Sequence, residues 1–532
     1  MCDCRGKVSG GLPLGEVSRF LEQRWPGLRV VLGDRLCEPG VLARLVSEQG
    51  VKPAVIGACP ELRSKLISWA ETEDSFAEVC SMSVVDVVGQ VSLPGSRSEL
   101  AERVKLLLWS RARRQSKFGG VPGESVKAQF SRPQGKMSRR ELFEMLVPRY
   151  QVVPYIQRQR CAGAATCRIC REVCPFGAIV IDGTAVSVDR LACRGCGACV
   201  AVCPYEAVVY PTFSLDQLES ELEGLLVEMG TLEPRIVAVT CRGGMCSPGD
   251  AAGSIGREDP LNVLPLEVPC LSMVSCWLLL RAFDMGAQGV ALVAASDGCQ
   301  FDGASARWLR EVELARRLLE RWGIEPGRIE VLDWDGSSGS VKRFAQEIRG
   351  MGPTRLREYR PAAVVDEGPA LAGLVLSLDT RLGASQVGSV PCGRMQAGYV
   401  IVDGTQCTAC GLCASDCPTG ALRWVAEGDS WSLLFDHALC VGCGQCVEVC
   451  PEGCLKLDNV IAPDKLGGPA EVVFGTGMVK CRECGAAVAP EAMVGRLRSK
   501  LAAAHGQTWQ LEICGACKLK IRSGREAGVS GA

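Results

Sequence analysis

The chain of 532 residues has only two histidines, His437 and His505, and aromatic residues make up 5% of it. Histidine-based acid–base catalysis and mixed Cys/His metal sites are therefore nearly excluded. An excess of charge of one sign is also missing, because 59 Lys and Arg are matched by 60 Asp and Glu, for a formal net charge of −1. Such a chain has no overall field that would attract a polyanion, so we expect no nucleic-acid partner.

Long apolar runs are missing as well. The longest notable run without a charge, residues 268–280, is shorter than the ~20 residues that span a bilayer. Residues 1–7 carry charges where a signal peptide would have its apolar core. We therefore expect a cytoplasmic protein without direct membrane insertion.

Cysteine, in contrast, is abundant, with 32 residues. Disulfides in such number are typical of small secreted domains, whereas a long chain with cysteines in C-x-x-C groups typically binds metal. The length predicts about three to five domains, at about 100–200 residues each. The metal ligands are then expected to be thiolates.

Two segments carry the bacterial run C-x₂-C-x₂-C-x₃-C-P, in which three close thiolates hold one [4Fe–4S] cluster and the fourth reaches the partner cluster. The proline ends the ligand loop. In the second segment the rule assigns the clusters to Cys407, Cys410, Cys413 and Cys450, and to Cys440, Cys443, Cys446 and Cys417. Disulfides or zinc knuckles are the alternatives, which this spacing strongly disfavours.

The first segment has one full run and one altered run. In the altered run Ala164 replaces the first cysteine, and Cys161 lies three residues earlier. The small residues between them can bulge outward and still present Cys161 to a cluster; a three-iron cluster is the alternative. We expect one [4Fe–4S] cluster on Cys161, Cys167, Cys170 and Cys203, and another on Cys193, Cys196, Cys199 and Cys174.

Between these segments, apolar stretches alternate between strand and helix patterns. Strands are expected at 235–240, 263–268, 289–294 and 329–332, and helices near 276–283 and 304–322. Cys241, Cys270 and Cys299 each follow a strand, and Cys246 can fold back to the same edge. Open α/β sheets build ligand sites at this edge, where helix N-termini stabilise thiolates. A fifth cluster is one interpretation and buried free cysteines the other; Cys276 is expected in the core.

Several of these stretches resemble the delta subunit of methyl-viologen-reducing hydrogenase. They are residues 235–241 leading to Cys246, 268–270, 283–290, 297–299 and 318–328. In that family the domain carries a [2Fe–2S] cluster and passes electrons from a hydrogenase or formate dehydrogenase to heterodisulfide reductase. The resemblance implies Cys241, Cys246, Cys270 and Cys299 as ligands.

The N-terminal region also alternates, with helices expected at 17–25, 41–49, 62–70 and 99–114 and strands at 28–32 and 53–57. Residues 2–6, 34–40, 56–60 and 79–81 resemble the opening domain of the heterodisulfide reductase A subunit. A further [4Fe–4S] cluster on Cys4, Cys37, Cys59 and Cys80 is one interpretation, and ordinary buried thiols are the other. That family continues with a flavin domain opening on G-x-G-x-x-G, which is absent between Val84 and Gln159, so we expect no flavin on this chain.

Near the C-terminus two C-x-x-C pairs flank an expected helix at 490–504. Their thiolates, on Cys481, Cys484, Cys514 and Cys517, suit a closed tetrahedral Zn²⁺ site, which would clamp a tail too short to build a core. A single rubredoxin-like iron is the alternative. Cys392 and Cys454 fall in no run and are expected to be core or loop thiols.

The predicted fold is multidomain, of the α/β plus α+β class. It combines two α/β domains with parallel sheets, two bacterial-type two-cluster ferredoxin modules and a small zinc-ribbon-like C-terminal domain. The expected boundaries are 1–115 (A-subunit-like domain), 116–150 (linker), 151–215 (first ferredoxin module), 230–350 (delta-subunit-like domain), 351–396 (connecting segment), 397–462 (second ferredoxin module) and 470–525 (Cys4 tail).

Low-potential clusters in series are the parts of an electron conduit. With the two resemblances, they predict an electron-transfer subunit of a heterodisulfide-reductase-like cytosolic complex in an anaerobe. The subunit would relay electrons between a hydrogenase or formate dehydrogenase and a flavin-containing, disulfide-reducing or ferredoxin partner. A self-contained iron–sulfur disulfide or thiol reductase and an iron–sulfur scaffold protein are the alternatives. No catalytic residue is assigned. The direction of electron flow and the final acceptor depend on the reduction potentials of the clusters, which a sequence does not fix.

Overall fold

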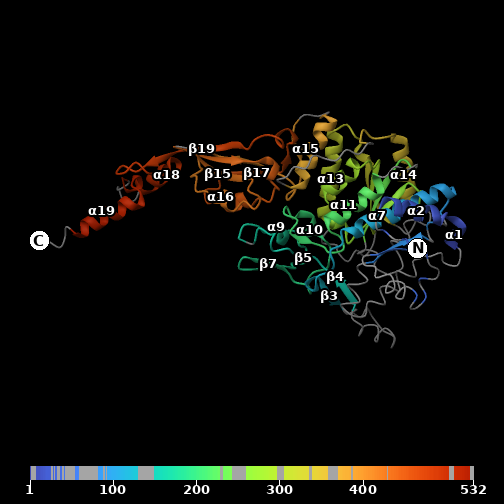
Figure 1. Cartoon of the computed structure of the whole chain (residues 1–532). Coiled ribbons are helices and arrows are strands. Elements are labelled where there is room, and N and C mark those ends of the chain that lie inside the picture. The colour runs from blue at the N-terminus through green and yellow to red at the C-terminus, as the bar shows by residue number, and fades with distance from the viewer. Residues whose placement is uncertain are drawn as a thin grey trace, which may run out of the picture. The chain divides into compact units, whose positions relative to one another are not determined.

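A computed structural model of the whole chain gives the structure, shown in Figure 1. It describes residues 1, 7–25, 28, 30–32, 36, 38, 41, 54–58, 82–87, 90, 93–129, 149–163, 165–227, 232–241, 259–295, 305–334, 338–356, 369–384, 388–427, 429–502 and 509–527. The chain forms two compact units. The first comprises Met1–Cys161, Arg168–Ala363 and Ser377–Val387, and the second Ala162–Cys167, Val364–Leu376 and Gly388–Ala532.

A four-stranded parallel sheet is the centre of the first unit, with the strand order β10-β9-β11-β12. The strands are β9 (Ile236–Cys241), β10 (Val263–Val268), β11 (Gly289–Ala295) and β12 (Ile329–Trp334). All neighbouring pairs are parallel, which confirms the predicted parallel sheet, and the strand ends differ from the prediction by at most two residues. The strands are mostly apolar because both faces of a parallel sheet are covered.

Helices cover this sheet. One face is packed by α14 (Gly339–Met351) through the buried Val341, Phe344 and Ile348. Helix α14 was not predicted. The two predicted helices are α12 (Cys276–Asp284), which packs on β11, and α13 (Ser305–Arg321), which packs on α12. Both are found within one residue of the predicted bounds.

The first ferredoxin module lies in the same unit. Its elements are β4 (Arg149–Val152), β5 (Tyr155–Ile156), α9 (Ile169–Glu172), β6 (Ile179–Asp182), β7 (Ala185–Val188), α10 (Ala198–Val202), β8 (Val208–Val209) and α11 (Leu215–Leu226). The strands pair antiparallel as β5-β8 and β6-β7. The segment 116–150, expected as a linker, contributes β3 (Val126–Gln129), which pairs antiparallel with β4. This part of the expected linker therefore belongs to the fold.

The described N-terminal elements are α1 (Lys7–Gly11), α2 (Leu14–Arg24), the parallel pair β1 (Ala54–Ala58) and β2 (Met82–Asp86), and α7 (Arg97–Ser116). Helix α7 begins with a capping box, in which Ser96 Oγ accepts from the Glu99 N–H at 3.3 Å and Glu99 accepts from the Ser96 N–H at 2.9 Å. The described residues of the expected strand 28–32 are not in a strand. Except for residue 41, the helices expected at 41–49 and 62–70 lie outside the described residues, as do Cys4, Cys37, Cys59 and Cys80.

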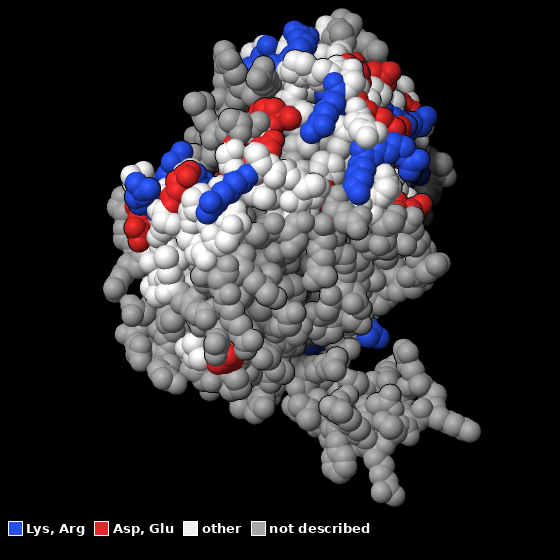
Figure 2. All heavy atoms as spheres, turned by 90° about the vertical axis from the view of Figure 1, so that its right-hand side faces the viewer, with Lys and Arg blue, Asp and Glu red and all other residues white. Residues whose placement is uncertain are grey.

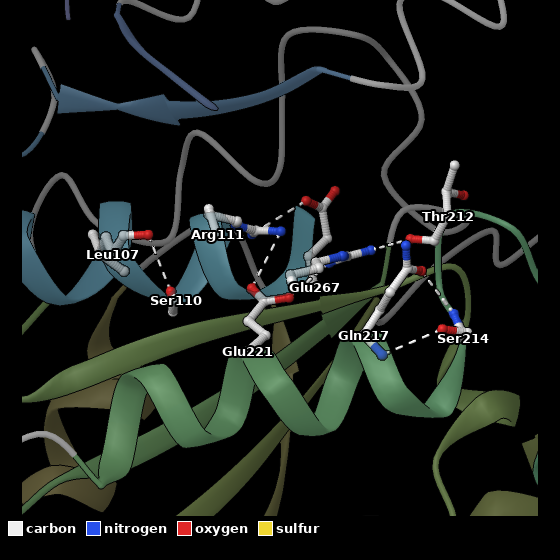
Figure 3. A network of polar contacts seen from close by, with 9 residues as sticks. Leu107, Ser110, Arg111, Thr212, Ser214, Gln217, Glu221 and Glu267 are labelled. Atoms are coloured by element: carbon white, nitrogen blue, oxygen red, sulfur yellow. Dashed lines mark hydrogen bonds and ion pairs between the residues drawn. The ribbon is translucent and has the colours of Figure 1, made fainter. Parts of the chain in front are cut away.

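Helix α7 packs along α11 through a buried polar network (Figure 3). The fully buried Glu221 carboxylate lies 3.2 Å from Arg111 and 2.7 Å from Arg114, and Arg111 also lies 3.6 Å from Glu267 of β10. The two helix backbones approach closely at Gly224, where a Cβ atom would lie 2.6 Å from Ser110 Cα. Helix α7 is therefore fixed to α11 and to the central sheet.

The second unit contains the second ferredoxin module. Its antiparallel pairs are β13 (Val390–Pro391) with β18 (Val460–Ile461), and β14 (Tyr399–Val402) with β17 (Leu455–Asp458). Short helices α16 (Leu412–Ser415) and α17 (Gln445–Glu448) follow the ligand loops. A second sheet has the order β15-β16-β19-β20, formed by β15 (Leu422–Glu427), β16 (Ser430–Phe435), β19 (Glu471–Lys480) and β20 (Ala487–Pro490).

The C-terminal tail continues this second sheet. Strand β19 pairs with β16 of the ferredoxin module and with β20 of the tail, so both parts share one sheet. Helices α18 (Glu491–Ala502) and α19 (Gly515–Ala527) follow, and in Figure 1 they extend beyond the end of β19. The expected helix at 490–504 corresponds to α18. The expected connecting segment 351–396 contains α15 (Ala370–Leu382).

The surface agrees with the balanced composition. On the face that Figure 2 shows, the Lys and Arg side chains of the described residues are interspersed with Asp and Glu. Within the described parts of the chain, no helix combines the length and the apolar character needed to cross a membrane.

Candidate functional site

In the second ferredoxin module, four predicted ligand cysteines line one pocket, namely Cys407, Cys410, Cys413 and Cys450. Trp424 of β15 and Leu433 of β16 line the same pocket. The other predicted group is also brought together: burial, with the neighbouring thiols of Cys446, Cys443 and Cys417, raises the pKa of Cys440 to about 12. The structure thus gathers the eight cysteines into the two groups that the spacing predicts.

The three full runs share an unusual ligand-loop backbone. Positive φ angles occur on both sides of the second cysteine, at Gly195 (73°) and Gly197 (76°), Ala409 (55°) and Gly411 (85°), and Gly442 (62°) and Gly444 (81°). The second residue of each pair is the N-cap of the short helix that carries the third cysteine. Left-handed residues in such loops turn backbone N–H groups to one side, and these nests bind anions. The loops therefore suit an anionic iron–sulfur cluster.

The altered run departs from this pattern in its backbone as well as in its sequence. Its helix α9, which carries Cys170, has Arg168 as N-cap with φ of −126° instead of a left-handed residue. Ala164, where the first cysteine would stand, lies outside the described residues. In the same group, Cys203 Sγ accepts a hydrogen bond from the Ala207 N–H at 3.2 Å. The ligand set with Cys161 and Cys167 stays a prediction.

The full run of the first module forms a second pocket, lined by Cys174, Cys193, Cys196 and Cys199. Two of these sulfurs accept backbone N–H groups, Cys174 from Ala178 at 3.3 Å and Cys193 from Gly195 at 3.4 Å. Burial raises the pKa of Cys196 to about 11. Because iron binds the thiolate, cluster binding at such buried thiols must release protons.

In the delta-subunit-like domain the structure places two of the four implied ligands at the same sheet edge. Cys241 ends β9 and is paired with Val268 of β10, and Cys270 follows two residues later. Burial, together with the neighbouring thiols of Cys241 and Cys196, raises the pKa of Cys270 to about 12, although hydrogen bonds with Ser272 act to lower it. Cys246 and Cys299 lie outside the described residues. Cys276 is fully buried at the start of α12, as expected for a core residue.

This edge lies directly against the first ferredoxin module. Cys270 belongs to one buried cluster with Cys196 and Ala198, against which Phe176 packs. Met273, in the 3₁₀ helix η2 (Leu271–Met273), lies so close to Gly197 that a Cβ atom there would meet its side chain at 3.0 Å. The candidate sites of two different domains therefore share one core, which no sequence pattern predicted.

Arg307, a largely buried cation, lies next to the contact between Cys270 and Cys196. Arg307 of α13 donates to the Ser272 carbonyl at 2.9 Å and forms an ion pair with Glu311 at 3.0 Å. Burial lowers the pKa of Arg307, while Glu311 and the nearby thiols of Cys196 and Cys199 act to raise it. Lys127 of β3 donates to the Cys193 carbonyl on the same module. Neither cation was predicted from the sequence, because neither lies near a cysteine run.

In the tail, all four predicted cysteines come together. The Sγ atoms of Cys481, Cys484, Cys514 and Cys517 lie within 4.8 Å of one another. A tetrahedral site with Zn–S bonds of about 2.3 Å has its sulfurs about 3.8 Å apart, and Cys484 Sγ lies 3.6 Å from Cys514 Sγ. A hydrogen bond from the Cys514 N–H lowers the pKa of Cys481 to about 6, which favours a thiolate. The four thiols therefore fit one tetrahedral metal ion.

Two further residues of the second module, Cys454 and His437, are placed by the structure near the site or in the core. Cys454, which belongs to no run, lines the pocket of Cys407, Cys410, Cys413 and Cys450, and its Sγ lies 3.4 Å from that of Cys450. Cys454 is a buried core residue, as expected, and its place in this pocket was not predicted. His437 is buried between two backbone groups: its Nδ1 lies 3.1 Å from the Gly398 carbonyl, and its Nε2 accepts from the Ala462 N–H at 2.8 Å. These contacts make it a structural residue.

Comparison with known proteins agrees with this arrangement. Residues 236–354 match the family of the methyl-viologen-reducing hydrogenase delta subunit, and residues 153–204 and 406–455 each match a 4Fe-4S dicluster domain. The iron-sulfur D subunit of the F420-non-reducing hydrogenase of Archaeoglobus profundus is 32% identical over 128 residues, which cover 93% of that protein and 23% of this chain. The corresponding protein of Methanopyrus kandleri is 30% identical over 132 residues, or 98% of that protein and 25% of this chain.

The chain is also similar to a heterodisulfide reductase subunit. The A subunit of the ferredoxin:CoB-CoM heterodisulfide reductase of Methanosarcina mazei is 25% identical over 206 residues. The match covers 37% of this chain but only 25% of that protein. The chain is thus an iron–sulfur electron-transfer subunit, and through residues 236–354 it belongs to the family of the methyl-viologen-reducing hydrogenase delta subunit.

Proposed function

We propose that this chain passes electrons between its delta-subunit-like domain and its first ferredoxin module, inside a cytoplasmic heterodisulfide-reductase-like complex. The partners would be a hydrogenase or formate dehydrogenase on one side and a flavin-containing, disulfide-reducing or ferredoxin protein on the other. The observation that carries the proposal is the shared core of Cys270 and Cys196, because it brings two candidate cluster sites into contact.

The proposed clusters follow from the thiol groups. Four [4Fe–4S] clusters belong to the ferredoxin modules, and the groups of Cys407 and Cys193 have the best support, since each lines a single pocket. A [2Fe–2S] cluster is proposed on Cys241, Cys246, Cys270 and Cys299, and a further [4Fe–4S] cluster on Cys4, Cys37, Cys59 and Cys80. When bound, these clusters supply one-electron chemistry; the residues around them bury the sulfurs and donate backbone N–H groups.

The proposed metal in the tail is Zn²⁺, held by Cys481, Cys484, Cys514 and Cys517. Its role is structural, because all four positions of a tetrahedral ion are taken by thiolates, which leaves none for a substrate. The support is the mutual distance of the four sulfurs, within 4.8 Å.

The first test is metal analysis of protein purified without oxygen, combined with electron paramagnetic resonance. About sixteen irons are expected from the ferredoxin modules, with two and four more from the other proposed clusters, and one zinc. An iron content near eight would contradict the relay. Turnover of a disulfide by the chain alone with reduced viologen would favour the reductase alternative instead.

The second test addresses the junction. Cys270→Ala is expected to remove the [2Fe–2S] signal and to prevent a hydrogenase partner from reducing the first module, while dithionite still reduces it. Cys276→Ala is the matched control, since it is another buried cysteine of the same domain, and it should keep both properties. Equal behaviour of the two variants would argue against the proposed path.

A further inference from the structure

A fifth thiol stands in the pocket of the second ferredoxin module. Cys454 is 6% exposed and lies just before β17, with its Sγ atom 3.4 Å from that of Cys450. The other three predicted ligands of this cluster, Cys407, Cys410 and Cys413, line the same pocket. Cys454 therefore shares one pocket with all four predicted ligands and lies beside one of them.

The other three runs show that the fold does not need a thiol at this position. Four residues after the last cysteine of each run stand Ala178, Ala207 and Ala421, where the remaining run has Cys454. The N–H groups of Ala178 and Ala207 donate to the last sulfur of their runs, at 3.3 and 3.2 Å. The fold thus forms with alanine at this position, and the thiol of Cys454 is an addition.

We propose that Cys454 is a reserve ligand, able to replace Cys450 on the [4Fe–4S] cluster of Cys407, Cys410, Cys413 and Cys450. The inference rests on the proposed assignment of that cluster. In the exchange, the bond from iron to Cys450 Sγ breaks and a new bond forms from iron to Cys454 Sγ. The proton that leaves the Cys454 thiol ends on the released Cys450 thiolate. Cluster charge, electron count and number of ligands stay the same, so no oxidant or reductant is needed.

The solvent exposure of this site suggests what a reserve ligand would do there. Cys410, in the same group, is exposed, whereas Cys454 is buried beside Cys450. When a ligand detaches from a cluster that solvent can reach, the iron at that corner can leave the protein. A second thiolate at the same corner allows iron to be held again before it leaves.

The test compares three variants purified without oxygen, by iron and sulfide analysis and electron paramagnetic resonance. Cys450→Ala is expected to keep the iron content and four-iron signal of the wild type. Cys450→Ala/Cys454→Ala is expected to lose one or more irons from this cluster and to show a three-iron signal. Cys417→Ala is the matched control, because Ala421 offers no reserve thiol, and it should lose iron as the double variant does.

Two more variants complete the design. Cys454→Ala should keep the wild-type iron content, since Cys450 is present, and Cys417→Ala/Ala421→Cys should regain the iron that Cys417→Ala loses. The proposal is overturned if Cys450→Ala loses as much iron as the double variant, or if Ala421→Cys restores nothing. A wild-type protein without clusters would instead contradict the proposed function itself.

Discussion

Arg307 is expected to raise the reduction potential of the cluster proposed on Cys193, Cys196, Cys199 and Cys174. Its guanidinium is held by the Ser272 carbonyl and by Glu311, and it is near enough to Cys196 and Cys199 to interact with their charge. Reduction adds one negative charge to a cluster, and a nearby cation stabilises that charge. Arg307→Gln should therefore lower the potential of this cluster.

The size of the effect follows from the electrostatics of a buried pair. At an effective dielectric constant of about 20, two unit charges interact by about 4 kcal/mol at 4 Å and by about 1.7 kcal/mol at 10 Å. Glu311, 3.0 Å from Arg307, offsets part of the cation's field. We expect a net loss of about 1–2 kcal/mol, which for a one-electron couple is about 40–85 mV.

The assay is a redox titration of the purified protein without oxygen, followed by electron paramagnetic resonance. Arg307→Lys, which keeps the charge, should stay close to the wild type, and Glu311→Gln should shift the potential upward. Arg310→Gln is the control for a general effect of α13, because Arg310 is exposed on the same helix. A potential unchanged or raised in Arg307→Gln would refute the reasoning.

Three further predictions concern stability and cluster loading. Glu221→Gln should reduce the free energy of unfolding by about 3–5 kcal/mol, because it removes the buried carboxylate that Arg111 and Arg114 share. Glu223→Gln, in a half-exposed pair, should change it by less than about 1 kcal/mol in denaturant titrations. Gly442→Ala should lower iron content, because its Cβ would lie 2.3 Å from the Ala397 carbonyl, while Gly453→Ala, also left-handed but with open space, should not. Burial lowers the pKa of His437 below its usual value near 6.5, so its contribution to stability is complete above that pH and is lost as pH falls. The difference in unfolding free energy between wild type and His437→Gln should therefore shrink between pH 7.5 and pH 5.5; a constant difference would contradict this.

Much of the sheet and of the ligand groups could be predicted because their signals are local. Each parallel strand is a short apolar run, and Cys241 and Cys270 follow such runs directly. Likewise, the rule that three cysteines of one run join the last cysteine of the partner run predicts which thiols line each of the two pockets. The strand β3 was missed because four residues in a polar segment carry no periodic signal, and their partner β4 does not follow them directly in the sequence.

The residues around the junction could not be predicted for a different reason. Arg307 and Cys196 come together only because two domains pack in a particular way, and no single motif encodes that packing. The buried Arg111 and Arg114 look in the sequence like a solvated helix face, although they pair with Glu221 inside the α7–α11 interface. For Cys454 a signal was present: aligning the four runs shows cysteine where the others have alanine.

Charge near the first module bears on the direction of the proposed relay. Lys127 lies buried against the loop of Cys193, and Arg307 lies close to Cys196 and Cys199, so two cations act on one predicted cluster from different elements. Both stabilise an added electron there, and the same cluster shares its core with Cys270. In the proposed relay these two cations would therefore favour an electron on the first ferredoxin module. The packing that brings the two candidate sites together and the cations beside them would then act in the same sense.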